Sequence, residues 1–181
     1  MPRINKTQFA LLGCLSIRPM SAYEVKQFMT QSTQYFWMEH EAQLYPTLKK
    51  LTADQFVQAK EEVAQKSGVR VVYKITDKGL TALRTWLDKK TDNAPYRNEF
   101  LLKLFFGNEM DQAVLLERLK EYQTEAQANL SHLQVIEGEL ANKPIPRKPY
   151  ILATIKYGIH ILKAEMAWCD EVMRSIQSDK S

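Results

Sequence analysis

A change of hydrophobic period within the first half of this sequence limits the folds it can adopt more than any other feature. Apolar residues recur at helical spacing over residues 7–17, 21–29 and 41–53 and then alternate with polar residues from Val69 to Ile75. This alternation predicts a half-buried strand, and residues 56–63 are its expected partner, with a glycine-containing tip at 65–68. Thr76 is expected to cap a fourth helix that ends near residue 88. Three helices, a two-stranded hairpin and a closing helix form the order of a winged helix-turn-helix.

The second half of the chain predicts helices alone. After a linker candidate at 91–95, helical patterns cover about 96–106, 111–142 and 149–177, and three prolines between residues 143 and 149 separate the last two. We therefore expect a mainly α protein with a small β wing. A winged helix-turn-helix DNA-binding domain is expected at 1–92, and an antiparallel helical dimerisation domain at 93–181. A chain of 181 residues is long enough for two domains of this size.

A heptad seam runs along the helix expected at 111–142. Its members step alternately by four and three residues: Leu115, Leu119, Tyr122, Ala126, Asn129, Leu133, Ile136 and Leu140. Roughly 30 residues at 1.5 Å each make an arm about 45 Å long, which a small domain does not cover by itself. We expect this arm to pack on a second subunit, and packing within the chain is the alternative.

The last helix is apolar over a wide arc, with two neighbouring stripes. One stripe is enough to dock a helix on its own domain, so the second indicates a further covered surface. Trp168 is the expected anchor of a dimer, and Asn129 is expected to set its register. The residues expected to make dimer contacts are Leu119, Tyr122, Asn129, Leu133, Tyr157, Ile161, Trp168 and Val172.

The positive charge of the chain is concentrated in its first half. The formal net charge is +4, with 14 Lys and Arg against 9 Asp and Glu in residues 1–94, and 11 against 12 in residues 95–181. A basic half joined to a nearly neutral half suits a protein of which only one part faces a nucleic acid.

The third helix is the expected reader of the major groove, since an α-helix fits that groove. Its leucines should face the core, which leaves Gln43, Thr47 and Lys50 outward, flanked by Lys49. Glutamine pairs with adenine, and lysine reaches guanine or phosphate. The wing and the start of the second helix, which a capping box over residues 21–24 predicts, are expected to contact the DNA backbone or minor groove. The expected DNA contacts are Ser21, Tyr23, Gln43, Tyr45, Thr47, Lys49, Lys50, Lys60, Lys66 and Arg70; ordinary solvated basic surface is the alternative.

Several segments resemble one family of regulators. Residues 43–51 (QLYPTLKKL) resemble the recognition-helix signature of the PadR family, and residues 21–24 (SAYE) and 70–79 resemble its second helix and second wing strand. Residues 98–107 (NEFLLKLFFG), together with Ala167-Trp168, resemble the virulence-activator-type C-terminal domain of its longer members. The chain departs from the family pattern in three places: Gln55 and Ala22 stand where glycine is common, and Glu41 adds a carboxylate near the start of the third helix.

The resemblance implies a cytoplasmic transcriptional regulator that binds double-stranded operator DNA as a homodimer. It also implies that the protein represses transcription and that a small, commonly aromatic effector releases it. Aromatic residues gather around Trp86 and over residues 100–106, and this is where we expect such an effector to bind. The alternative for these rings is ordinary core packing.

Other classes of protein find little support in the sequence. Three scattered histidines lack metal-ligand spacing, and no nucleophile-elbow, P-loop or dinucleotide motif is present, so we expect no catalytic residue, metal or cofactor. No apolar run is long enough to span a membrane, and no targeting pattern is visible. Cys14 and Cys169 are expected to be buried, reduced thiols, with a redox pair as the alternative. The remaining alternative is a helical adaptor that dimerises without binding DNA.

Overall fold

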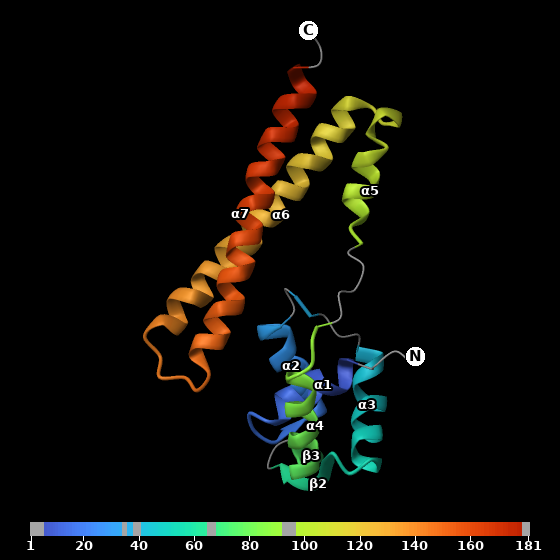
Figure 1. Ribbon diagram of the computed structural model, residues 1–181, viewed down its shortest axis with the longest axis vertical. Helices are drawn as coiled ribbons and strands as arrows, with labels where there is room; N and C mark the ends of the chain where they lie inside the picture. The colour runs from blue at the N-terminus through green and yellow to red at the C-terminus, as the bar shows by residue number, and fades with distance from the viewer. Residues whose placement is uncertain (1–5, 34–35, 38–40, 65–67, 92–96, 179–181) are drawn as a thin grey trace. The chain divides into compact units, whose positions relative to one another are not determined.

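The computed structural model describes residues 6–33, 36–37, 41–64, 68–91 and 97–178. The chain divides into two compact units, Met1–Asn93 and Ala94–Ser181. The N-terminal unit contains α1 (Lys6–Leu15), β1 (Met20–Ser21), α2 (Ala22–Ser32), α3 (Glu41–Ala53), β2 (Val57–Ala64), β3 (Gly68–Ile75) and α4 (Asp77–Leu87) (Figure 1). The predicted order of three helices, a hairpin and a fourth helix is confirmed.

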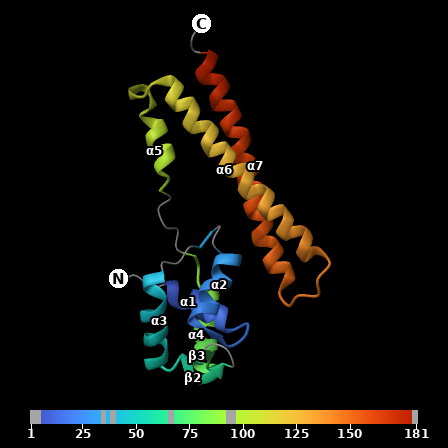
Figure 2. The same ribbon diagram turned by 180° about the vertical axis from the view of Figure 1, so that it is seen from behind.

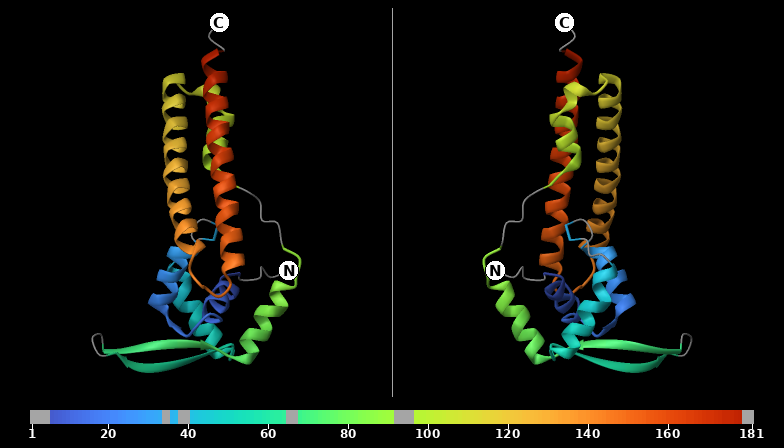
Figure 3. Two further views of the ribbon diagram at one scale, coloured as in Figure 1. Left: turned by 90° about the vertical axis from the view of Figure 1, so that its left-hand side faces the viewer. Right: turned by 90° about the vertical axis from the view of Figure 1, so that its right-hand side faces the viewer.

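The sheet has a third strand that we did not predict. β1 pairs with β3 in antiparallel fashion, with Met20 opposite Tyr73, so that the strand order is β1-β3-β2. A strand of two residues is too short to show an alternating pattern in the sequence, so β1 is recognised only from its pairing with β3. β2 and β3 pair along their full length, from Val57 opposite Ile75 to the tip, and Figure 3 shows this hairpin projecting as a wing.

The core of the N-terminal unit lies between α1, α3 and the base of the sheet. Leu11, Leu12 and Leu15 of α1 are at most 2% exposed and belong to one cluster with Leu48 and Leu51 of α3. The cluster continues through the buried side chains of α2, β2 and α4. Because the leucines of α3 are embedded in this cluster, the rotation of α3 about its own axis is fixed.

The C-terminal unit is a helical hairpin with a short helix packed on it. It contains α5 (Glu99–Phe105), the 3-10 turn η1 (Gly107–Glu109), α6 (Gln112–Ala141) and α7 (Lys148–Ser178). Figures 1 and 2 show α6 and α7 running side by side in opposite directions, joined by a short loop. The predicted antiparallel helical domain is therefore confirmed.

The heptad seam of α6 packs on α7 of the same chain. Leu119 and Leu133 are 0% and 2% exposed, and α7 contributes Ile155 and Ile159 to the inner face of the hairpin. The prediction that Leu119 and Leu133 contact a second subunit is therefore wrong.

The prediction that Asn129 belongs to the seam is also wrong. Asn129 is exposed, and Leu130, which is 6% exposed, takes the inner position. The predicted positions on either side, Ala126 and Leu133, are 4% and 2% exposed, so the departure is confined to this turn. Leu130 follows Ala126 by four residues and precedes Leu133 by three, which is the spacing of one helix face.

Side chains at the α5 end of the hairpin form an aromatic cluster. The Phe100 and Tyr122 rings stack with centroids 4.6 Å apart, and Trp168 meets both edge-on at 6.3 Å. The Tyr122 hydroxyl donates a hydrogen bond to Glu165 Oε1 at 3.0 Å. Trp168 and Val172 are only half-buried, and they belong to this cluster within the chain.

Gln55 has a φ of 62°, in the left-handed region that glycine adopts most easily. It lies two residues after the end of α3, where its backbone turns the chain toward β2. This conformation explains physically why glycine suits the position. A residue with a Cβ pays about 1 kcal/mol or more to adopt it.

Two helical glycines of different surroundings test this packing. A Cβ at Gly79 of α4 would lie 2.1 Å from the Phe56 carbonyl oxygen, which already accepts hydrogen bonds from Thr76. We expect Gly79→Ala to lower the free energy of unfolding by about 1–3 kcal/mol because backbone has to shift. A Cβ at Gly138 of α6 would meet no atom within 4 Å. Gly138→Ala should therefore raise the free energy of unfolding by about 0.5–1 kcal/mol. Urea unfolding measures both, and a neutral Gly79→Ala would contradict this packing.

Candidate nucleic-acid interface

The outer face of α3 is the central feature of the candidate site. Leu44, Leu48 and Leu51 are 3%, 0% and 2% exposed and hold α3 in the core. Gln43, Lys49 and Lys50 are exposed on the remaining surface, and Tyr45 is 56% exposed. The helix thus presents one amide, two ammonium groups and one phenol to solvent, all of which can donate hydrogen bonds to base edges or phosphates.

Thr47 lies on the buried side of α3. It is 5% exposed, so the prediction that it faces outward is wrong. Its position explains the error: Thr47 follows Leu44 by three residues and precedes Leu51 by four, so it shares a face with both. The burial of Thr47 removes it from the surface that can meet DNA.

Three cations of the wing lie on one face of the hairpin. Register pairs Lys60 with Val72 and Arg70 with Glu62, which places Lys60, Arg70 and Lys74 on the same face of the hairpin. Lys74 was not among the predicted contacts, although its alternation with Arg70 would have found it. Lys66 falls at the tip, outside the described residues.

The opposite face of the hairpin exposes two valines and one glutamate toward its tip. Val69 and Val71 are 64% and 38% exposed, and Glu61 lies opposite Val71. Nearer the core, Tyr73 on this face packs against the buried cluster. Burial raises the pKa of Tyr73, and the nearby Tyr45 of α3 adds to the effect.

The start of α2 is closed by the predicted capping box. Glu24 N–H donates to Ser21 Oγ at 3.3 Å, and Ser21 N–H donates to Glu24 Oε2 at 2.8 Å. The Ser21 N–H, with help from the Ser21 hydroxyl and Arg18, holds the pKa of Glu24 below its usual value. Two of the N–H groups that we expected to meet a phosphate are therefore used within the protein. Tyr23 is 67% exposed and stays on the candidate surface.

Arg18, which the sequence did not single out, belongs to this region. Its guanidinium lies 3.3 Å from Glu24 Oε1, and Arg70 of the wing lies 3.7 Å from Glu24 Oε2. Arg70 also pairs with Glu62 at 3.4 Å. Ion pairs thus connect the start of α2 to the wing. No local sequence motif predicts this connection, because the residues are far apart in the chain.

Other kinds of site find no support among the described residues. No group of three or more His, Cys, Asp or Glu side chains in the described ranges is placed to hold a metal ion. Of the helices described, none has the length and apolar character to cross a membrane. Both thiols are buried, and burial raises the pKa of Cys14 to about 12. A thiol with so high a pKa is a poor nucleophile at neutral pH.

Two family models match this chain. The model of the transcriptional regulator PadR-like family matches residues 11–85, and the model described as virulence activator alpha C-term matches residues 96–177. The negative transcriptional regulator PadR of Bacillus subtilis is 24% identical over 181 residues, which cover 95% of this chain and 98% of that protein.

Solved structures share the fold over nearly the whole chain. Bacillus subtilis PadR in complex with operator DNA superposes with a TM-score of 0.87 at 21% identity, covering 96% of this chain and 99% of that one. The same protein in complex with p-coumaric acid gives a TM-score of 0.77 at 22% identity, with 98% of both chains covered.

Proposed function

Because the chain belongs to the PadR-like family of transcriptional regulators, we propose that it binds an operator as a homodimer and represses transcription until a small molecule releases it. The observation that carries the proposal is the outer face of α3, where Gln43, Lys49 and Lys50 are exposed on a helix whose rotation the core fixes. The DNA complex of Bacillus subtilis PadR supports the class of partner. This function would place the protein in the cytoplasm and requires no enzymatic activity.

Contacts with DNA divide by role. Gln43 and Lys50, seven residues apart on α3, lie on one face and are proposed to read base edges, with Tyr45 and Lys49 beside them. Lys60 and Arg70 of the wing are proposed to meet phosphates, which adds affinity without sequence preference. Lys66 and Tyr23 remain proposed backbone contacts, and Thr47 is withdrawn because it is buried.

Removal of the base-reading side chains tests the assignment of α3. In the Gln43→Ala, Lys50→Ala double variant we expect operator binding to weaken by about 1–3 kcal/mol for each base that is no longer read. Binding to DNA of random sequence should fall less, because phosphate contacts remain. Fluorescence anisotropy with labelled duplexes measures both.

The α6 surface offers a matched control with the same spacing. Lys120 and Gln127 are exposed and also lie seven residues apart, so the Lys120→Ala, Gln127→Ala variant should bind DNA like the wild type. Unchanged operator affinity in the α3 double variant would show that α3 is not the recognition helix. A dimer that binds no duplex at all would favour the adaptor alternative.

The dimer is proposed to form through apolar surface that the hairpin leaves uncovered. On α7, Tyr150, Tyr157 and Ile161 are 77%, 64% and 41% exposed, and on α5, Leu102 and Phe105 are 61% and 80% exposed. Tyr150, Tyr157 and Ile161 share one face of α7 at helical spacing, and an exposed apolar face of this kind marks a contact with another protein. Tyr157 and Ile161 thus remain proposed dimer contacts, and Trp168 contributes less because its ring packs on Phe100 and Tyr122.

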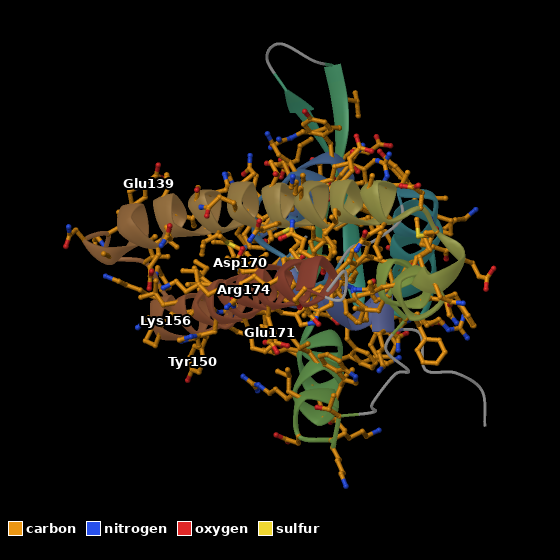
Figure 4. The ribbon with its side chains drawn as sticks, turned by 90° about the horizontal axis from the view of Figure 1, so that it is seen from above. Glu139, Tyr150, Lys156, Asp170, Glu171 and Arg174 are labelled. Carbon is orange, nitrogen blue, oxygen red and sulfur yellow. The ribbon has the colours of Figure 1, made fainter. Side chains whose placement is uncertain are left out.

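Figure 4 shows Lys156 toward one end of α7, and Asp170, Glu171 and Arg174 toward the other. Asp170 accepts a hydrogen bond from the Gln123 amide of α6 at 2.6 Å, so it belongs to the contact within the hairpin and not to the proposed dimer face. A two-fold dimer in which the α7 helices meet through Tyr157 and Ile161 would match an operator with two related half-sites.

A charged side chain on the outer face of α7 should prevent dimer formation. We expect Tyr157→Lys combined with Ile161→Lys to yield a folded monomer, because two ammonium groups would be buried without partners. Val135→Lys is the control, since Val135 is 59% exposed on α6 and lies outside the proposed contact. Sedimentation velocity at micromolar concentration decides, and a monomeric wild type would overturn the proposed dimer.

The effector is proposed to bind beside α5. Trp86 stacks on Phe9 at 4.8 Å within the N-terminal unit, so its ring is ordinary core packing. In the C-terminal unit, an open depression of about 540 Å³ is lined by Phe100, Tyr122 and Met110, among others. An aromatic ligand could stack there on the exposed edges of the cluster. The p-coumaric acid complex of Bacillus subtilis PadR supports an aromatic class of ligand.

Tryptophan fluorescence tests the effector site. Titration with phenolic acids should change the emission of Trp168, whose ring meets Phe100, and the change should be lost in Trp168→Phe but kept in Trp86→Phe. The same ligand should lower operator affinity, as a ligand that prefers the unbound state does. A flat response across a broad panel of aromatic metabolites, with DNA binding untouched, would count against this site.

A further inference from the structure

Four charged side chains form a chain of ion pairs between α2 and the wing. Arg70 on β3 pairs with Glu62 on β2 at 3.4 Å and with Glu24 on α2 at 3.7 Å. Arg18, which precedes α2, pairs with the other oxygen of Glu24 at 3.3 Å. Two arginines and two glutamates cancel, so this group adds no net charge to the surface that the wing offers to DNA.

The two carboxylates differ in what would remain if Arg70 left them. Glu24 would keep Arg18 and two hydrogen bonds from Ser21, one from its N–H and one from its hydroxyl, both 2.8 Å long. Among the described residues, the partner of Glu62 is Arg70 alone. Transfer of Arg70 to a phosphate would therefore leave the Glu62 carboxylate unpaired and close to a second negative group.

From this arrangement we propose that Glu62 restrains Arg70 and so limits the binding of the wing to DNA of arbitrary sequence. The inference rests on the proposed DNA-binding function and identifies Glu62 as a specificity-determining residue for it. An arginine that is already neutralised displaces fewer counterions from DNA when it binds, so it adds less to sequence-independent affinity. Contacts from α3 to a matching site then contribute a larger share of the total binding free energy. This is because the ion pair of Arg70 and Glu62 does not affect the reading of bases.

A purely structural role for the pair makes a different prediction. Cross-strand ion pairs stabilise a hairpin modestly. If that were the whole role of Glu62, its removal would lower stability and leave DNA affinity unchanged or weaker. The restraint proposed here requires instead that DNA affinity rise when Glu62 is removed.

Glu61 supplies the matched control. It is the neighbour of Glu62 on β2, is also exposed, lies on the opposite face of the hairpin, and makes no ion pair with the described residues. Glu62→Gln and Glu61→Gln change the net charge equally, but only the first releases Arg70. The probe is a duplex of random sequence, bound by the full-length protein between about 50 and 200 mM salt.

We expect Glu62→Gln to bind the random duplex about two- to fivefold more tightly at low salt, which corresponds to the removal of one exposed ion pair. The slope of the logarithm of affinity against the logarithm of salt concentration should become steeper by about one, the value for one additional phosphate contact. Glu61→Gln should give a clearly smaller gain. In an Arg70→Gln background, Glu62→Gln should raise the affinity for the random duplex no more than Glu61→Gln does. The cation that Glu62 restrains is absent from that background.

Two results would overturn the inference, and they are distinguishable from failure of the proposed function. The first is an equal response of Glu62→Gln and Glu61→Gln. The second is a gain from Glu62→Gln that persists undiminished in the Arg70→Gln background. A wild-type protein that binds no duplex at any salt would instead overturn the proposed function, and the inference with it.

Discussion

The burial of three leucines on α3 determines what the N-terminal unit can present to a partner. Leu44, Leu48 and Leu51 pack with α1 in the main core, and each is at most 3% exposed. Rotation of α3 by one residue would expose a leucine and bury a lysine, at a cost of several kcal/mol. The core therefore orients Gln43 and Lys50 without any contact to those side chains. The position of the wing follows as well, since β2 begins directly after the turn that ends α3.

Much of this organisation could be predicted because its signals are local. The capping box of Ser21 and Glu24, the alternation in β3 and the helical spacing of the leucines each involve residues a few positions apart. One of the two apolar stripes expected on the last helix includes Ile155, Ile159 and Cys169, and the structure places these side chains against α6. The resemblance of residues 43–51 to one family then added a function that periodicity alone does not provide.

The remaining features depend on contacts between distant segments or on small angular differences. Thr47 was placed on the wrong side of α3 because the three leucines mark the centre of the buried face but not how far it extends around the helix. Thr47 lies within that face. Asn129 was placed in the seam because Asn129 and Leu130 both lie three or four residues from Ala126 and Leu133, and strict alternation of the steps selected Asn129. β1 and the ion pair of Arg70 with Glu24 arise only when the start of α2 and the wing meet. The length of α6 suggested a second subunit, but α7 has nearly the same length and covers it within the chain.

The central claim is that an exposed face of α3, carried by a two-fold dimer, reads a defined DNA sequence. Selection from a random duplex library with the full-length protein tests this claim most directly, because it assumes no operator. The account predicts enrichment of sites with two symmetry-related halves, separated by about 10–10.5 base pairs or a multiple of that distance. A library that emerges without any enriched sequence, from protein shown to be folded and dimeric, would contradict it.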